Sequence, residues 1–338
     1  MSAMRPAGPP RAPKPYGYVP LGDGTVARRD PLFTQGHDRQ VPGALSGHLA
    51  GRLVALTPLH VGASTVERTA RILPTLAAET PLLFPLARAG ETPVLPGTTL
   101  KGALRSIVEA ITASCLTVRG PATRLLPPPL HALRPCTRRD ALCPACRLFG
   151  GQGYLGRLRV ADASLAEGST SIARVPERHP PRAGRGAPPP GRRFYGHGRP
   201  ASGPLPVEVF PEGSALAWRI DCANLQPAEL GLLLLALGQG EPPLRLKLGG
   251  YKPTCFGSAE FIVTSLVLDE PATRWLRYEP ARFATPAPDD GASAGNAPDL
   301  HGYLEAALDS GLVLRDRLDR LAGILRYPSG RDCPAEGY

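Results

Sequence analysis

The sequence predicts an α+β fold, because strand-like and helix-like segments follow one another along the first 268 residues. Two segments are predicted to be helices, 98–111 and 227–237, and the second is so apolar that we expect it to be buried. Alternating apolar residues predict four strands, at 46–58, 157–163, 215–222 and 255–268. The 41 prolines and 38 glycines among 338 residues predict many loops between these elements.

The order strand, helix, strand, strand, helix, strand is the ferredoxin-like pattern that RNA-recognition domains share. We therefore expect a ferredoxin-like or RRM-like palm with large insertions, formed by one domain at 16–268, since no internal repeat divides that region. The remaining boundaries predict a disordered lead at 1–15, insertions at 116–150 and 172–203, a linker at 269–298 and a C-terminal helical extension at 299–338.

The first predicted helix has cations away from its apolar face. We expect Thr98 or Thr99 to be its N-cap, after a Pro-Gly turn. Lys101 and Arg105 lie one turn apart. Free N–H groups at the helix start, together with Lys101, would hold one or two phosphates, although an ordinary capped helix with solvated cations fits the pattern as well. The apolar stripe consists of Leu100, Leu104, Ile107, Val108 and Ile111.

A second possible phosphate grip is the loop at 249–252. Gly249 and Gly250 would allow close approach of a backbone, with Tyr251 beside them and Lys252 as the counter-charge. The spacing matches neither a Walker loop nor a dinucleotide fingerprint. A tight turn before a strand is the alternative interpretation.

Three of the seven cysteines are clustered, and they predict a structural zinc site. Cys143 and Cys146 form a Cys-x-x-Cys knuckle, and Cys136 lies just upstream. His131 is the preferred fourth ligand, with Cys115 or no protein ligand as alternatives. A catalytic zinc is not favoured, because no Glu stands beside the histidine as in deaminases.

The charge is consistent with a polyanionic partner. Its formal value is +10, and residues 172–203 contain seven arginines against one acid, Glu177. Cations next to aromatic residues are typical of base stacking and phosphate contact, although a solvated loop has the same composition. His197, beside Tyr195, would suit general acid/base chemistry, but we expect it to be a polar surface residue. The candidate RNA contacts here are Arg192, Arg193, Phe194 and Tyr195.

No apolar run approaches the roughly 20 residues that cross a bilayer, and the N-terminal segment lacks the apolar core of a secretory signal. We therefore expect a cytoplasmic protein without a membrane partner. In that compartment, seven cysteines favour metal binding over disulfides.

Several collinear motifs, which are distributed over most of the range 15–268, resemble the RAMP superfamily. The resemblance is specifically to the backbone (Cas-seven-type) subunits of type III CRISPR effector complexes. The motifs are PYGYVPL, HDRQ, LSGHL, LTPLHVG, LPGTTLKGALRSIVEA, CPACRLFG, GRLRVADA, GRRFYGHG and LGGYKPTCFGSAEF.

The resemblance implies an RRM-like palm, a protruding thumb hairpin and assembly with other RAMP subunits along a guide RNA that pairs with a target RNA. It further implies that Lys101, Arg105 and the loop at 249–252 follow the guide backbone. A zinc knuckle is frequent in such subunits where this chain has one. The segment at 172–203 is either the thumb or a neighbouring insertion.

One departure from the family pattern concerns RNA cleavage. In relatives that cut the target RNA, an Asp lies in the loop after the first strand. Residues 62–93 offer Glu67, Glu79 and Glu91 but no Asp. The longer Glu side chain would misplace a metal or water, and small misplacements are costly. We therefore predict guide binding without cutting and assign no catalytic residue.

Two other functions fit parts of the sequence. The chain would be a metal-independent endoribonuclease that processes guide RNA if His60 or His37 moved the 2′-hydroxyl proton. Alternatively, it would be a zinc-stabilised assembly adaptor that uses the leucine-rich C-terminal helices and binds no RNA.

Overall fold

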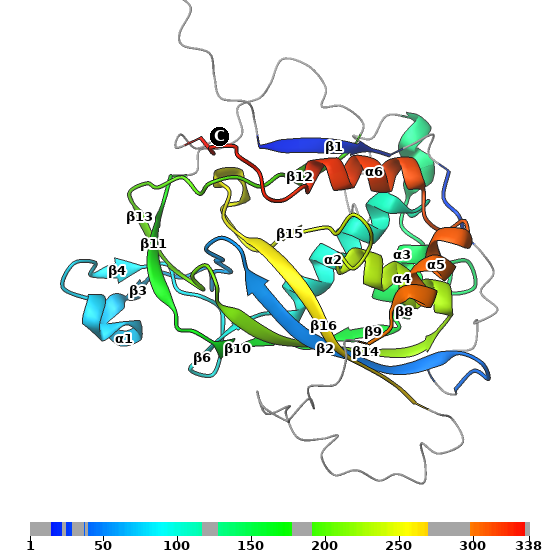
Figure 1. The fold of residues 1–338 in the computed structure, drawn as a ribbon, viewed down its shortest axis with the longest axis horizontal. Coiled ribbons are helices and arrows are strands. Elements are labelled where there is room, and N and C mark those ends of the chain that lie inside the picture. The colour runs from blue at the N-terminus through cyan, green and yellow to red at the C-terminus, as the bar shows by residue number, and fades with distance from the viewer. Residues whose placement is uncertain are drawn as a thin grey trace, which may run out of the picture.

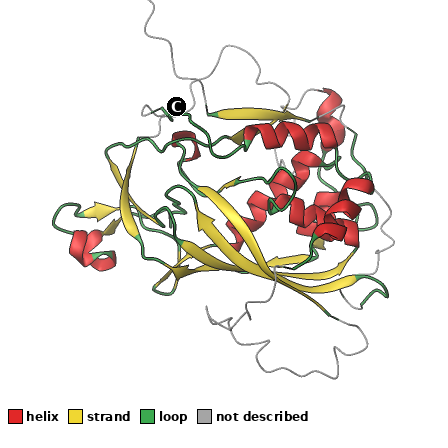
Figure 2. Ribbon diagram, in the orientation of Figure 1, coloured by secondary structure: helices red, strands yellow, loops and turns green. Residues whose placement is uncertain are grey.

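A curled antiparallel sheet forms the centre of the molecule, and the longer helices lie on one side of it (Figures 1 and 2). The computed structural model describes residues 15–21, 25–28, 37, 40–116, 128–177, 191–269 and 298–334. The predicted lead at 1–15 and linker at 269–298, apart from their ends, therefore lie outside the described residues.

Five strands give the sheet its ferredoxin-like order. β16 (Ser258–Leu268) pairs with β2 (Leu45–Ala55), β2 with β14 (Ala215–Leu225), and β14 with both β9 (Leu158–Val160) and β10 (Ala163–Glu167). Every one of these pairs is antiparallel. The α+β prediction is confirmed, and the order of strands is that of a ferredoxin-like palm.

Two helices complete this pattern. α2 (Gly97–Ile111) lies between β2 and β9 in the chain, and α4 (Pro227–Ala236) lies between β14 and β16. The predicted apolar stripe of α2 is buried along its whole length, including Leu100 and Leu104. α4 is buried from Glu229 to its end, as its composition predicted, because α5 covers the side that the sheet does not.

Shorter elements extend the sheet and form ribbons around it. β15 (Leu246–Lys247) flanks β16, whereas β6 (Thr92–Leu95) and β5 (Arg88–Ala89) continue beyond β10. The remaining short elements are β3 (Glu67–Arg68), β4 (Leu82–Leu83), β7 (Gly150–Gly151), β8 (Tyr154–Leu155), α1 (Thr69–Ile72), α3 (Pro144–Phe149), η1 (Pro74–Leu76), η3 (Pro128–Leu133) and η4 (Lys252–Thr254).

The arginine-rich insertion is divided between two ribbons. β11 (Ser171–Val175) pairs with β13 (Leu205–Val209), at one end of the molecule. β12 (Gly191–Tyr195) instead pairs with β1 (Tyr16–Pro20), so a strand from the N-terminal part of the chain lies against the later part of the insertion. The segment is therefore more than one hairpin.

The two predicted C-terminal helices pack on the same core as the sheet. α5 (His301–Asp309) contacts α4, and α6 (Arg315–Ile324) lies beside α2 and β1. Gly231 permits the close approach of α4 and α5, since a Cβ atom there would lie 1.8 Å from the Tyr303 carbonyl oxygen. Within the described ranges, no helix is both long and apolar enough to cross a membrane.

A disulfide joins Cys255 to Cys333, with their Cα atoms 5.9 Å apart. The preference for metal over disulfides is therefore wrong for these two cysteines. Their separation of 78 residues, across the predicted linker, explains why spacing along the chain did not indicate the pair.

Candidate metal centre and nucleic-acid surfaces

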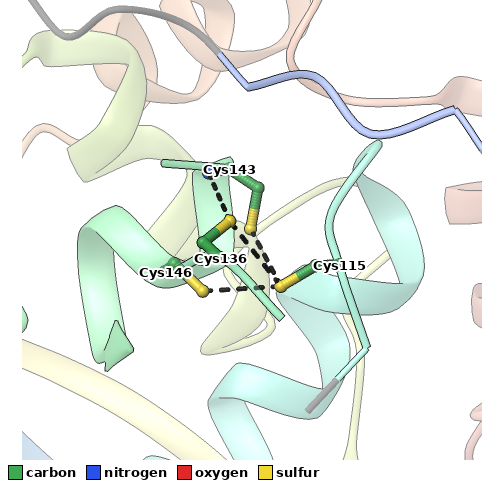
Figure 3. Close-up of side chains that lie close together, drawn as sticks. All are labelled: Cys115, Cys136, Cys143 and Cys146. Carbon is green, nitrogen blue, oxygen red and sulfur yellow. Dashed lines mark hydrogen bonds between the residues drawn. The ribbon is translucent and has the colours of Figure 1, made fainter. Parts of the chain in front are cut away.

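Four buried cysteines form the candidate metal centre (Figure 3). Cys115 follows α2, Cys136 lies in the next described loop, and Cys143 and Cys146 come from the start and the first turn of α3. The Cys115 sulfur lies 3.5 Å from the sulfurs of Cys143 and Cys146 and 3.9 Å from that of Cys136, and all four lie within 4.8 Å of one another. A tetrahedral ion with metal–sulfur bonds of about 2.3 Å requires sulfurs about 3.8 Å apart. The arrangement therefore fits one four-coordinate ion.

The fourth member of this cluster is Cys115, so the preference for His131 is wrong. His131 lies in η3, whose neighbouring Leu130 and Leu133 are buried against Leu116. The Ala145 N–H of the knuckle donates to the Ser114 hydroxyl at 3.1 Å, so the end of α2, and with it Cys115, lies beside the knuckle. Sequence spacing alone ranked His131 first because it lies closer to the knuckle along the chain.

The four thiols also influence one another's ionisation: the pKa values of Cys136 and Cys143 are lowered, and those of Cys115 and Cys146 are raised. Hydrogen bonds with Cys115 lower the pKa of Cys136 and lower that of Cys143 to about 6. Hydrogen bonds with the same neighbours raise the pKa of Cys115. Thiolates at these distances repel one another, so all four ionise together only when a cation lies among them. The site thus suits a divalent metal with no open position.

Arg105 supports this centre from α2. Its guanidinium donates to the Cys146 sulfur at 3.4 Å and to the Gly150 carbonyl oxygen at 2.7 Å. It also pairs with Glu109, whose side chain is 2% exposed, at 2.7 Å. Hydrogen bonds of this kind orient ligands and balance their negative charge. The described contacts of Arg105 are therefore internal, whereas the sequence had predicted an RNA phosphate as its partner.

Glu109 connects the metal centre to β12. One of its carboxylate oxygens accepts from Arg105 and the other from Arg192. Arg192 therefore points inward, toward α2. Phe194, two residues further along β12, likewise packs on the core. Of the four residues predicted to contact RNA in this strand, Arg193 and Tyr195 lie on its other face.

Lys101 and Arg105 line a shallow hollow of about 210 Å³ beside the knuckle, together with Gly150, Gly151 and Tyr154. The Lys101 ammonium donates to the Leu158 carbonyl oxygen at 3.0 Å. Burial, and then the charge of Arg105, lowers the pKa of Lys101. Lys101 is the cation of this hollow that is best placed to meet an anion, because Arg105 is held by Glu109.

The start of α2 is closed by a side chain that the sequence analysis missed. Pro96 is the N-cap, without a side-chain cap, so the assignment of Thr98 or Thr99 to this position is wrong. The Gly97 N–H donates to an Asp162 carboxylate oxygen at 2.7 Å. This carboxylate occupies the position where we expected a phosphate. Asp162 lies inside the predicted strand RLRVADA, between β9 and β10 of the structure, where the sequence pattern gave no reason to single it out.

The loop at 249–252 packs on its own molecule. Gly249 has φ +71°, and a Cβ atom there would lie 2.1 Å from the His60 carbonyl oxygen. The Gly250 N–H donates to the same oxygen. Tyr251 is 5% exposed and packs with Phe256 on the β11–β13 ribbon. The glycines are therefore explained by a close chain crossing, and Lys252, whose pKa burial lowers, is the remaining candidate contact.

That Lys101 and the loop at 249–252 bind the same stretch of guide-RNA backbone stays a prediction. Lys101 lies beside the cysteine cluster, whereas Lys252 lies beside the β11–β13 ribbon and the disulfide.

Two of the candidate histidines are buried. His60 is 5% exposed, and its Nδ1 contacts the Glu208 carbonyl oxygen at 2.7 Å. His197 is 1% exposed, so the prediction of a surface residue is wrong for it. Its ring contacts the Ser258 hydroxyl at 2.9 Å and the Arg245 carbonyl oxygen at 3.1 Å. His37 contacts the Leu155 carbonyl oxygen. Burial makes His60 a poor general base for a large RNA substrate.

Comparison with known proteins finds one family that part of the chain matches. Residues 52–213 match the RAMP superfamily. This region includes the end of β2, all of α2, the four cysteines and the arginine-rich insertion. No curated protein matches the chain significantly. The match supports RAMP superfamily membership and leaves the type of subunit open.

Proposed function

We propose that the chain is a non-catalytic, guide-RNA-binding subunit of a type III CRISPR ribonucleoprotein. In this role it would assemble with other RAMP subunits in the cytoplasm and aid recognition of a complementary target RNA. The observation that carries the proposal is the RAMP superfamily match over residues 52–213, because RAMP proteins generally bind RNA within multisubunit complexes. The ferredoxin-like sheet supports it, since RNA-recognition domains share this architecture.

Charge gives independent support. A formal charge of +10 favours a polyanionic partner, and RNA is the polyanion that the family match indicates. Binding should weaken steeply with salt. For a single-stranded nucleic acid, the logarithm of the affinity falls by roughly 0.7 for each neutralised phosphate per unit of log salt.

The metal proposed for the four cysteines is zinc. Four sulfur ligands without a free position are typical of structural zinc, although iron also accepts four thiolates. The ion would hold the insertion at 116–150 against the end of α2, because its ligands come from both. Metal analysis of the purified protein distinguishes zinc from iron.

Lys101 and Lys252 are the proposed contacts to the guide backbone. Lys101→Glu and Lys252→Glu should each weaken RNA binding, and the loss should be the same for every RNA sequence. Each should also reduce the slope of log affinity against log salt concentration by roughly 0.7. Arg138→Glu is a matched control, because Arg138 is exposed and lies outside both proposed contacts. Equal retention of RNA by all three variants would exclude Lys101 and Lys252 as contacts.

RNA that co-purifies with the protein tests the function directly. The chain is expressed with a CRISPR array and purified, and the bound RNA is sequenced. Guide RNA should be enriched over cellular RNA. A preparation that carries no RNA and assembles normally with its partners would support the adaptor function instead.

The absence of cutting is tested with a matched target RNA and Mg²⁺. Residues 62–93 contain no Asp, and Glu67 pairs with Arg71 at 3.5 Å. We expect the target to remain intact opposite this subunit. Cleavage that disappears in Glu67→Ala would show that the subunit is a nuclease.

A further inference from the structure

The β1–β12 ribbon has one face turned to the core and one turned away from it. Tyr16 lies opposite Tyr195, and Tyr18 lies opposite Arg193. Opposed residues in antiparallel strands share a face, so these four side chains are neighbours. The other face carries Val19, which is fully buried, together with Arg192 and Phe194, whose contacts with α2 and the core are described above.

The four outer side chains form a cluster of rings around one cation. The Tyr16 ring lies edge-on to the rings of Tyr18, at 5.7 Å, and Tyr195, at 5.9 Å. The Arg193 guanidinium carbon lies 5.3 Å from the centres of both the Tyr16 and the Tyr195 rings. Arg193 is exposed, and among the described residues no carboxylate pairs with it. The two rings therefore hold a cation in place whose charge is not neutralised by an acid in this part of the chain.

This combination suits a particular ligand. Aromatic rings stack on nucleic-acid bases whatever their identity, and an arginine beside them both stacks and contacts phosphate. We propose that the outer face of the β1–β12 ribbon, formed by Tyr16, Tyr18, Arg193 and Tyr195, stacks bases of single-stranded RNA.

The position of the ribbon is consistent with access by RNA. β1 lies on the outside of the molecule, next to α6 (Figure 1). Gly17 lets the ribbon rest on α6, because a Cβ atom there would lie 2.8 Å from the Ile324 side chain. The inner face is thus fixed by packing, and the tyrosines are held rather than free to reorganise, which favours binding.

The inference rests on the proposed RNA binding and adds a site to it. The test uses the full chain and two fluorescent 15-nucleotide RNAs of equal charge, one of uridines and one with several abasic positions. Tyr16→Ala and Tyr195→Ala should each reduce affinity for the uridine RNA about tenfold or more and leave the salt slope unchanged. Affinity for the abasic RNA should change little. Tyr16→Phe keeps the ring and should bind like the original protein.

Each outcome bears on the inference. If the alanine variants bind the uridine RNA as the original protein does, the stacking site is wrong while the proposed function stands. If the original protein binds neither RNA, both the stacking site and the proposed RNA-binding function are wrong. Loss of binding in Tyr16→Phe equal to that in Tyr16→Ala would also exclude stacking. Should an alanine variant fail to fold, 4-thiouridine crosslinking of the original protein decides, since the crosslinked peptide must contain β1 or β12.

Discussion

The buried histidine His197 makes a quantitative prediction about pH. It lies at the junction of the insertion, the sheet edge and the C-terminal segment, where it contacts Ser258, the Arg245 carbonyl oxygen and the Tyr327 ring. Burial, and then the nearby charge of Lys247, lowers its pKa from 6.5 to about 4. The folded protein therefore keeps His197 neutral over a pH range in which the unfolded chain protonates it.

The sign and size of the effect follow from this difference. Between pH 6.5 and about 4 the unfolded state binds more protons, so the free energy of unfolding falls as the pH falls. The full difference corresponds to about 3.4 kcal/mol below pH 4, and at pH 5 it amounts to about 2 kcal/mol. Above pH 6.5 His197 contributes no pH dependence.

Urea unfolding at pH 7.5 and pH 5 measures this contribution. The loss of stability between the two pH values should be about 2 kcal/mol smaller in His197→Gln than in the original protein. Metal release at low pH affects both proteins alike and cancels in the comparison. His301→Gln, which removes an exposed histidine, is the matched control and should lose as much stability as the original. Equal losses in the original protein and His197→Gln would refute the reasoning.

Three further predictions concern the metal centre, the disulfide and the start of α2. Cys115→Ser should lower the bound metal well below one ion per chain, whereas His131→Ala should keep it, as measured by elemental analysis. Reduction of the disulfide should lower the free energy of urea unfolding by about 4.5 kcal/mol, because the bond closes a loop of 78 residues; mass spectrometry verifies that the bond is reduced. Asp162→Ala should cost about 1–2 kcal/mol in thermal unfolding and Thr98→Ala under about 0.5 kcal/mol, since Asp162 bonds the first helical N–H.

The fold was largely predictable because local patterns and tertiary packing agree. The stripe of α2 and the apolar run of α4 each indicated the face that the core covers, and both are buried. The strands at 157–163 and 215–222 were placed correctly, although β9 and β10 share the first of them with a break between. What the sequence could not supply was the pairing of β1 with β12, because no local pattern relates strands about 175 residues apart.

The candidate site was less predictable, and the errors share one cause. A positive side chain on an amphipathic helix has the same sequence signature whether its partner is a phosphate or a carboxylate of the same protein. Arg105 and Arg192 both meet Glu109, a glutamate at the buried end of α2 that the helical pattern gave no reason to single out. Similarly, Gly249 has the positive φ that would suit a phosphate-binding loop, but in the structure it allows the loop to pass close to the His60 carbonyl group.

The same reasoning indicates where RNA contacts should be sought. Glu109 and the cysteine sulfurs hold the cations nearest the metal centre, so these cations are poor candidates for guide contacts despite their motif. Arg193 has the opposite properties, because strand alternation turns it away from α2 and two tyrosine rings hold it without an acid among the described residues. An arginine whose described partners are aromatic rings can donate to a phosphate or stack on a base without first breaking an ion pair. The outer face of the β1–β12 ribbon, where Arg193 is exposed and the three tyrosines are half-buried, is therefore a stronger candidate for RNA contact than Arg105 on α2.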